Sequence, residues 1–137
     1  MKKMNLVHFS ATGTTKSIAT ALVSRLCDQV TEFDLLRQPL KKPDAFEPDA
    51  PTVFAVPVYA GRVPALCTNL LKQFSGRNTP AIAVVVYGNR DYDDALLELC
   101  DLISENGFVV VAAAAFVAQH SIFPAVASGR PDENDKQ

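Results

Sequence analysis

The stretch from Leu6 to Ser17 constrains the fold of this chain most strongly. A short apolar segment there runs into a hydroxyl-rich turn and then into a helical pattern. Gly13 gives the turn the backbone freedom that lets consecutive N–H groups converge on an anion at the positive end of the following helix. The hydroxyl groups that can join them belong to Ser10, Thr12, Thr14 and Thr15. The stretch therefore predicts a phosphate-binding turn between a strand and a helix.

Two common nucleotide-binding motifs are missing from this turn. Lys16 follows two threonines rather than a glycine, so no GxxxxGK[ST] motif can be written, and GxGxxG is also absent. These absences disfavour nucleoside triphosphate and dinucleotide sites of the usual kinds. The turn fits a terminal phosphate that is held by hydroxyls and amides, without a metal or a fixed cation.

In order and position, residues Ser10 to Thr15 resemble the S/T-x-T-G-x-T loop that wraps the FMN phosphate in the flavodoxin-like family. Three later segments resemble one branch of that family, the N-terminal flavodoxin domain of fusion proteins that continue into a ferredoxin-type (4Fe-4S) domain. They are Pro57–Pro64, Tyr87–Tyr92 and Phe116–Phe123. This resemblance covers essentially the whole chain. It implies FMN as the cofactor, electron transfer as the function, and an iron–sulfur domain or another redox protein as the partner.

Length and composition favour one packed domain that spans residues 1–137. At 48% hydrophobic residues, a chain of 137 residues can bury a core without disulfides or metal. A net charge of −2, with no basic cluster longer than two residues, argues against nucleic acid as a partner. Cys27, Cys67 and Cys100 lie far apart in helical apolar patterns, so we expect buried free thiols. No CxxCxxC pattern is present, so we expect no iron–sulfur cluster in this chain.

The two ends of the chain suggest a location and a possible truncation. The longest apolar run, 108–118, is too short to span a bilayer, and Met1-Lys2-Lys3 is not followed by an apolar signal core. We therefore expect a cytoplasmic protein. Residues 129–137 resemble the start of a last helix that the sequence does not continue. Its truncation would leave one sheet face uncovered, so we expect a monomer or a weak homodimer.

Apolar segments alternate along the chain in the manner of strands and helices. Four prolines between Leu36 and Pro51 exclude a helix of ordinary length, so the second helix is expected to be short or absent. A flexible interdomain linker is the alternative for this segment. The alternation predicts an α/β fold with a doubly wound five-stranded parallel sheet, and the resemblance implies the strand order 2-1-3-4-5. The expected strands are 3–9, 30–35, 52–56, 81–87 and 108–117, with helices after 15, 64 and 91.

In this strand order a ligand binds at the C-terminal ends of the first and third strands. Two further loops meet the phosphate turn there, and each carries a glycine and an aromatic residue. Tyr59 or Tyr92 could stack on an isoalloxazine ring, and Gly61 could carry a peptide that reorients when the flavin N5 gains a proton. Two ordinary turns with surface tyrosines are the alternative. Besides the phosphate turn, the predicted cofactor-binding residues are Val58, Tyr59, Ala60, Gly61, Arg62, Gly88, Asn89, Arg90, Asp91 and Tyr92.

Two arginines and two histidines need separate interpretation. Arg62 and Arg90 occupy loops that carry acids in the flavodoxins this chain resembles. An arginine beside the ring would stabilise the anionic hydroquinone and make that couple less negative. The alternative is that both are solvated rim residues or neighbours of the phosphate. We expect His8 to be an ordinary strand histidine and His120 to have a structural or interface role.

Three functions remain open from the sequence. An FMN-binding electron carrier needs no acid, base or nucleophile, and the sequence predicts no catalytic residue and no metal ligand. An FMN-dependent NAD(P)H or quinone reductase would need a substrate platform, and the loops here are short. A degenerate flavodoxin fold without flavin is the third possibility. A phosphoaspartate receiver is disfavoured, because Val56-Pro57 and Phe9-Ser10 stand where it would need acids.

Overall fold

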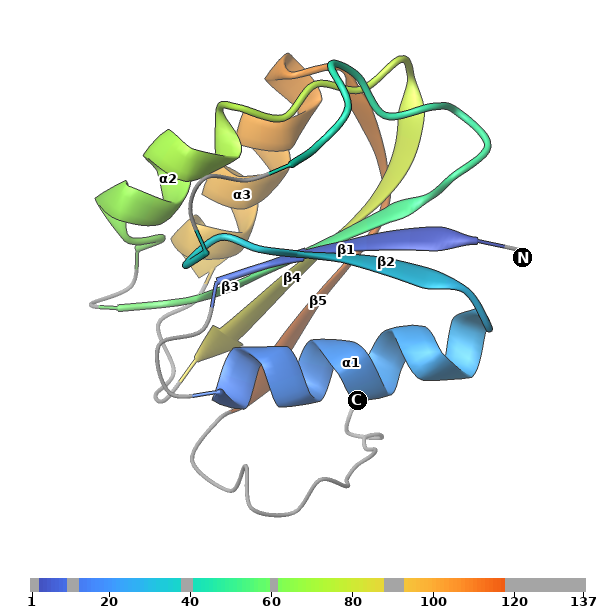
Figure 1. Cartoon of the computed structure of the whole chain (residues 1–137). Coiled ribbons are helices and arrows are strands. Elements are labelled where there is room, and N and C mark those ends of the chain that lie inside the picture. Colours follow the sequence, from blue (N-terminus) through green and yellow to red (C-terminus); the bar gives the residue numbers. More distant parts are fainter. Residues whose placement is uncertain (1–2, 10–12, 38–40, 60–61, 88–92, 118–137) are drawn as a thin grey trace.

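Five parallel strands form one sheet in the order β2-β1-β3-β4-β5 (Figure 1). The computed structural model describes residues 3–9, 13–37, 41–59, 62–87 and 93–117. Their elements are β1 Met4–His8, α1 Thr14–Leu26, β2 Val30–Asp34, β3 Thr52–Pro57, α2 Ala65–Leu71, β4 Thr79–Tyr87, α3 Asp93–Glu105 and β5 Phe108–Val117. The predicted fold class and strand order are both confirmed.

The central strands are covered on both faces. All six residues of β3 are buried, as expected for a continuously apolar strand inside a parallel sheet. On one face, Met4 and Leu6 of β1 pack in a cluster with Ala19 and Val23 of α1. The other face packs against α2, α3 and the segment that joins β2 to β3 (Figure 1). The sheet is therefore doubly wound.

No helix is present in the described residues between β2 and β3, so the predicted absence of an ordinary second helix is confirmed. Phe46 anchors this segment instead. Its ring is buried, and its N–H donates to the Ser75 carbonyl oxygen at 2.7 Å. The segment thereby covers the sheet face that a helix would cover. Phe46 belongs to a group of phenylalanines that contact one another largely edge to face, namely Phe33, Phe46, Phe54, Phe74 and Phe108.

Gly107 and Pro64 lie at helix ends. Gly107 has a φ of +96° and follows α3, as expected for a glycine that ends a helix. Pro64 is the N-cap of α2, with ψ at 141°, and the first helical residue is Ala65. Helix α2 ends at Leu71, and the apolar stripe continues to the buried Phe74 in the turn that follows.

Strand β5 lies at the edge of the sheet and is interrupted by a bulge. Ala81 pairs with Val110 and Ile82 pairs with Ala112, so Val111 has no partner on β4 and is 63% exposed. Val109 on this strand is also exposed. The truncated last helix expected at 129–137 and His120 lie outside the described residues.

The three cysteines are free thiols, as predicted, with Cys27 and Cys67 buried and Cys100 partly buried. Burial raises the pKa of Cys67 to about 12, which keeps this thiol protonated and unreactive. Among the described residues, no helix has the length and apolarity needed to cross a bilayer.

Candidate functional site

Strands β1, β3 and β4 are neighbours in the sheet, and their C-terminal ends lie at one edge. His8 pairs with Ala55, and Pro57 pairs with Val86. The chain reverses its winding direction between β1 and β3, which is where ligands bind in open α/β sheets. The described members of the predicted loops come from two of the three, the loops that follow β1 and β3: Gly13, Thr14, Thr15, Val58, Tyr59 and Arg62. The other predicted site residues lie outside the described residues: Ser10, Thr12, Ala60, Gly61, Gly88, Asn89, Arg90, Asp91 and Tyr92.

The N-terminus of α1 is suited to an anion. Gly13 is its N-cap, with φ at 90°, and no side chain of a described residue caps the helix there. The first turn contains no acidic residue, so no carboxylate competes for its N–H groups. A Cβ atom added at Gly13 would meet nothing within 4 Å among the described atoms. An anion could therefore approach the backbone at this point.

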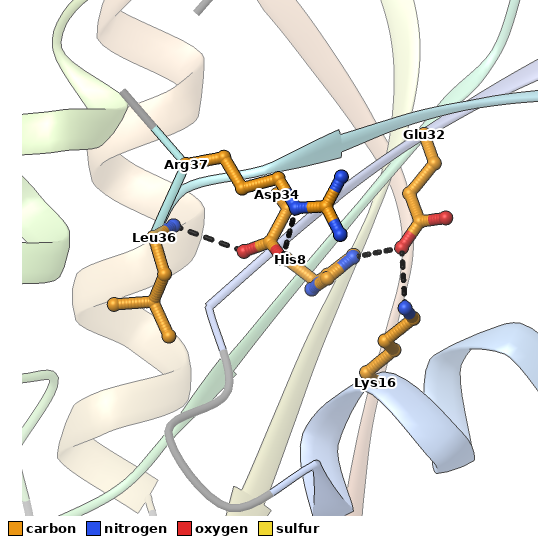
Figure 2. A network of polar contacts seen from close by, with 6 residues as sticks. All are labelled: His8, Lys16, Glu32, Asp34, Leu36 and Arg37. Carbon is orange, nitrogen blue, oxygen red and sulfur yellow. Dashed lines mark hydrogen bonds and ion pairs between the residues drawn. The ribbon is translucent and has the colours of Figure 1, made fainter. Parts of the chain in front are cut away.

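A polar network lies beside this helix end (Figure 2). His8, only 1% exposed, bonds through Nε2 to the Glu32 Oε2, and the Lys16 Nζ lies 3.5 Å from the same oxygen. Because a carboxylate only accepts hydrogen bonds, the proton of this bond lies on Nε2. The buried Nδ1 has no partner among the described residues. His8 is thus a buried strand residue, as predicted, whose ring is oriented by Glu32.

No sequence motif marks Glu32. It lies on β2 opposite Leu6 of β1, and its carboxylate reaches both His8 and Lys16. Only the register between β1 and β2 places the three side chains together, and one sequence does not reveal that register.

The turn after β2 is fixed locally, because the Leu36 N–H donates to the Asp34 Oδ1 at 2.9 Å (Figure 2).

We expect Glu32→Gln to lower the free energy of unfolding by about 1 kcal/mol at neutral pH. Burial alone would raise the pKa of Glu32, but its interactions with His8 and Lys16 lower it below the ordinary 4.5. A lowered carboxyl pKa contributes stability that is present above pH 4.5 and is lost as the pH falls through the folded-state value. The difference between wild type and variant should therefore shrink below pH 4.5 in urea unfolding followed by circular dichroism.

Glu105→Gln is the matched control for this measurement. The Glu105 side chain has no hydrogen bond or ion pair with another described residue. Its substitution should change the unfolding free energy by less than about 0.5 kcal/mol at every pH. Equal pH profiles for the two variants would show that the His8–Glu32–Lys16 network contributes no stability.

The described residues at the two ends of the second predicted loop are paired through their backbones. Tyr59 and Arg62 exchange two backbone hydrogen bonds, of 2.9 and 3.0 Å, and the Tyr59 side chain is 54% exposed. An exposed aromatic ring at this edge is available for stacking. Arg62, which the sequence places near the ring system, forms an ion pair with Glu98 of α3 at 3.1 Å. Any effect of its charge on a ligand is reduced by that carboxylate.

A shallow groove of about 480 Å³ lies along the outer side of α3. It is lined by four acidic residues and one arginine, together with Leu97 and Leu102. Four carboxylates would repel a phosphate group, so this groove does not suit a phosphorylated ligand. The acids are Asp94, Glu98, Asp101 and Glu105, and the arginine is Arg62.

Comparison with solved structures identifies the fold as flavodoxin-like. A flavoprotein from Lactobacillus acidophilus, solved in complex with FMN, matches with a TM-score of 0.63 at 14% identity, over 89% of this chain and 97% of its own. A flavodoxin from the domain Archaea matches with a TM-score of 0.61 at 17% identity, over 89% of each chain. Fusobacterium nucleatum flavodoxin bound to flavin mononucleotide matches with a TM-score of 0.55 at 15% identity, over 81% of this chain and 70% of its own.

Comparison by sequence adds no relative. No family model matches the chain, and no curated protein matches it. The similarity to flavodoxins found by comparison is therefore one of fold.

Proposed function

We propose that this chain binds FMN and carries electrons, and that it exchanges them with an iron–sulfur domain or protein. The observation that supports this most is that helix α1 begins at Gly13, just after β1, while the exposed Tyr59 follows the neighbouring strand β3. Flavoproteins of the same fold have been solved with FMN. When bound, the isoalloxazine ring would supply the redox chemistry itself.

The residues present fit the phosphate end of such a ligand. The acid-free first turn and the helix N-terminus together favour a dianion. Lys16 lies in this same turn, and its charge is shared with Glu32. Thr14 and Thr15 are the first two residues of the helix, and Thr15 is buried.

Tyr59 in the second loop suits the isoalloxazine end of FMN. Tyr59 is exposed on a turn whose base is closed by backbone hydrogen bonds, so the ring can be presented without ordering a long loop. Electron transfer needs a ring edge near the surface and no acid, base or nucleophile. This requirement agrees with the sequence, which predicts no catalytic residue in these loops.

A binding assay with FMN and riboflavin tests the proposal. Titration of the purified chain should quench flavin fluorescence, because a stacked aromatic ring quenches the excited flavin. FMN should bind at least about tenfold more tightly than riboflavin, since riboflavin lacks the phosphate and its charge-assisted hydrogen bonds. Equal affinities would contradict the phosphate assignment, and binding of neither flavin would contradict the proposed function.

Gly13→Ala is the informative variant in this assay. An alanine at a φ of 90° is strained by about 1–2 kcal/mol, although no described atom would clash with its methyl group. The cap should therefore shift and weaken FMN binding about tenfold. Riboflavin binding should remain unchanged.

A further inference from the structure

The turn after β3 is closed at its base by backbone hydrogen bonds. Val58 N–H donates to the Val86 carbonyl oxygen at 2.9 Å, which ties the start of the loop to β4. Tyr59 N–H then donates to the Arg62 oxygen at 2.9 Å, and Arg62 N–H donates back to the Tyr59 oxygen at 3.0 Å. This reciprocal pair fixes Tyr59 and Arg62 relative to each other. It does not hold the turn as a whole against the rest of the protein.

Glu98 supplies that second constraint from α3. Its Oε1 accepts hydrogen bonds from the Arg62 Nε and from the Val63 N–H, both at 3.2 Å. Its Oε2 accepts from the Arg62 Nη2 at 3.1 Å. The guanidinium and the carboxylate thus meet through two parallel hydrogen bonds, a geometry with strong directional preference.

The partners of Glu98 differ in burial, and this makes the contact more than a surface ion pair. The Arg62 side chain is 68% exposed, whereas Val63 is 4% exposed and belongs to the core cluster beneath α2 and α3. The Glu98 side chain is only 26% exposed. One carboxylate therefore joins the exposed turn to a buried backbone N–H, and it does so from the helix that follows β4.

Glu98 also determines where Arg62 points. Its interaction with Arg62 turns the guanidinium toward α3, where Asp94 adds to the attraction. The other acids along this side of the helix are Asp101 and Glu105. The arginine is thus engaged on the outer side of α3 and serves to hold the turn.

We propose that Glu98 is a positioning residue for the flavin: it holds the base of the turn, Tyr59 to Val63, against α3 and so fixes the Tyr59 ring relative to the flavin-binding edge. The proposal rests on the proposed function, because it assigns Glu98 a role in tuning the flavin that this edge would bind. Glu98 itself touches no flavin and acts through Tyr59, Arg62 and Val63.

Amide hydrogen exchange tests the structural half of this proposal without flavin. In Glu98→Ala, the Arg62 amide should exchange about tenfold faster than in wild type, although its own acceptor, the Tyr59 oxygen, is still present. Glu98→Gln keeps an acceptor oxygen for the Val63 N–H but loses the charge. The exchange rate of the Arg62 amide in this variant should therefore fall between the rates in wild type and in Glu98→Ala. Glu105→Ala, on the same helix and groove, should leave the Arg62 amide unchanged.

Potentiometry of the FMN-loaded chain tests the functional half. Glu98→Ala should change the relative affinity for oxidised and reduced FMN about tenfold, which equals about 59 mV for a one-electron couple. Glu105→Ala removes the same charge from the same helix and should leave the potentials unchanged. This contrast separates the position of the turn from the general charge of α3.

Three results would overturn the role proposed for Glu98. Unchanged exchange of the Arg62 amide in Glu98→Ala would overturn the proposal, as would faster exchange with unchanged potentials. Equal shifts of the potentials in Glu98→Ala and Glu105→Ala would overturn it as well, because they would reflect charge alone. A wild-type chain that binds no FMN contradicts the proposed function and with it the tuning role, while the exchange experiment still decides whether Glu98 holds the turn.

Discussion

Gly107→Ala should destabilise the protein by about 2–5 kcal/mol, which is a large part of the stability of an ordinary domain. Two effects combine at this position. The φ of +96° strains any residue with a Cβ, and a Cβ placed there would lie 2.3 Å from the Gly76 carbonyl oxygen. Urea unfolding followed by circular dichroism should show a lower midpoint with an unchanged slope.

The surrounding hydrogen bonds explain why Gly76 cannot move away. Gly76 N–H donates to the Asn106 oxygen at 2.9 Å, and Asn78 N–H donates to the Gly107 oxygen at 2.9 Å. The loop after α2 is therefore tied to the loop after α3 on both sides of the contact. Any shift that makes room for a methyl group would lengthen these bonds.

Gly13→Ala is the matched control, because it separates conformational strain from steric clash. Gly13 has a similar φ of +90°, but a Cβ there meets nothing within 4 Å among the described atoms. Its substitution should cost only about 1–2 kcal/mol. Equal losses of stability in the two variants would show that the close approach of Gly76 contributes nothing.

The fold class could be predicted because it depends on local patterns, whereas the strand order followed from the resemblance to flavodoxins. The apolar runs at 52–56 and 81–87 are typical of buried parallel strands, and the apolar stripe of the helix between them has ordinary helical spacing. The glycine turn at Gly13 and the proline-rich segment before β3 fixed the two connections that distinguish this fold. The bulge at Val111 leaves no comparable pattern, because Phe108 to Val117 is apolar throughout.

The side-chain contacts of the site could not be predicted in the same way. Glu98 contacts Arg62 and Val63, which lie more than thirty positions away in the sequence. Glu32 contacts His8 on the neighbouring strand. Neither acid differs by pattern from the other surface acids of its element. Arg62 was assigned to the ring system because its loop position was visible in the sequence, whereas its partner on α3 was not.

Gly76 and Gly107 contact each other at the end of the sheet that lies opposite the proposed flavin site. Gly76 precedes β4 and Gly107 precedes β5, so they adjoin the N-terminal ends of these strands. The proposed cofactor loops follow β1, β3 and β4 at the other edge. Substitutions at the N-terminal edge should therefore lower the folded fraction, and the folded molecules should keep their affinity for FMN.

Phe46→Ala should cost about 3–5 kcal/mol of stability, because its ring holds the segment that replaces a second helix. The ring is 2% exposed and lies 5.2, 5.6 and 5.9 Å, centroid to centroid, from the rings of Phe33, Phe74 and Phe108. The Phe46 carbonyl oxygen accepts from the Thr79 hydroxyl at 2.7 Å, and an alanine keeps that bond. The expected loss therefore comes from the ring, and urea unfolding at neutral pH measures it.

Two neighbouring variants make the result specific to that ring. Phe46→Leu should lose less than half as much as Phe46→Ala, since leucine refills most of the cavity. Glu47→Ala, which removes an exposed ion pair with Arg77 from the same segment, should change stability by less than about 0.5 kcal/mol. If Phe46→Ala were as mild as Glu47→Ala, the segment would behave as a linker, and the sheet face above Phe33 and Phe54 would need another cover.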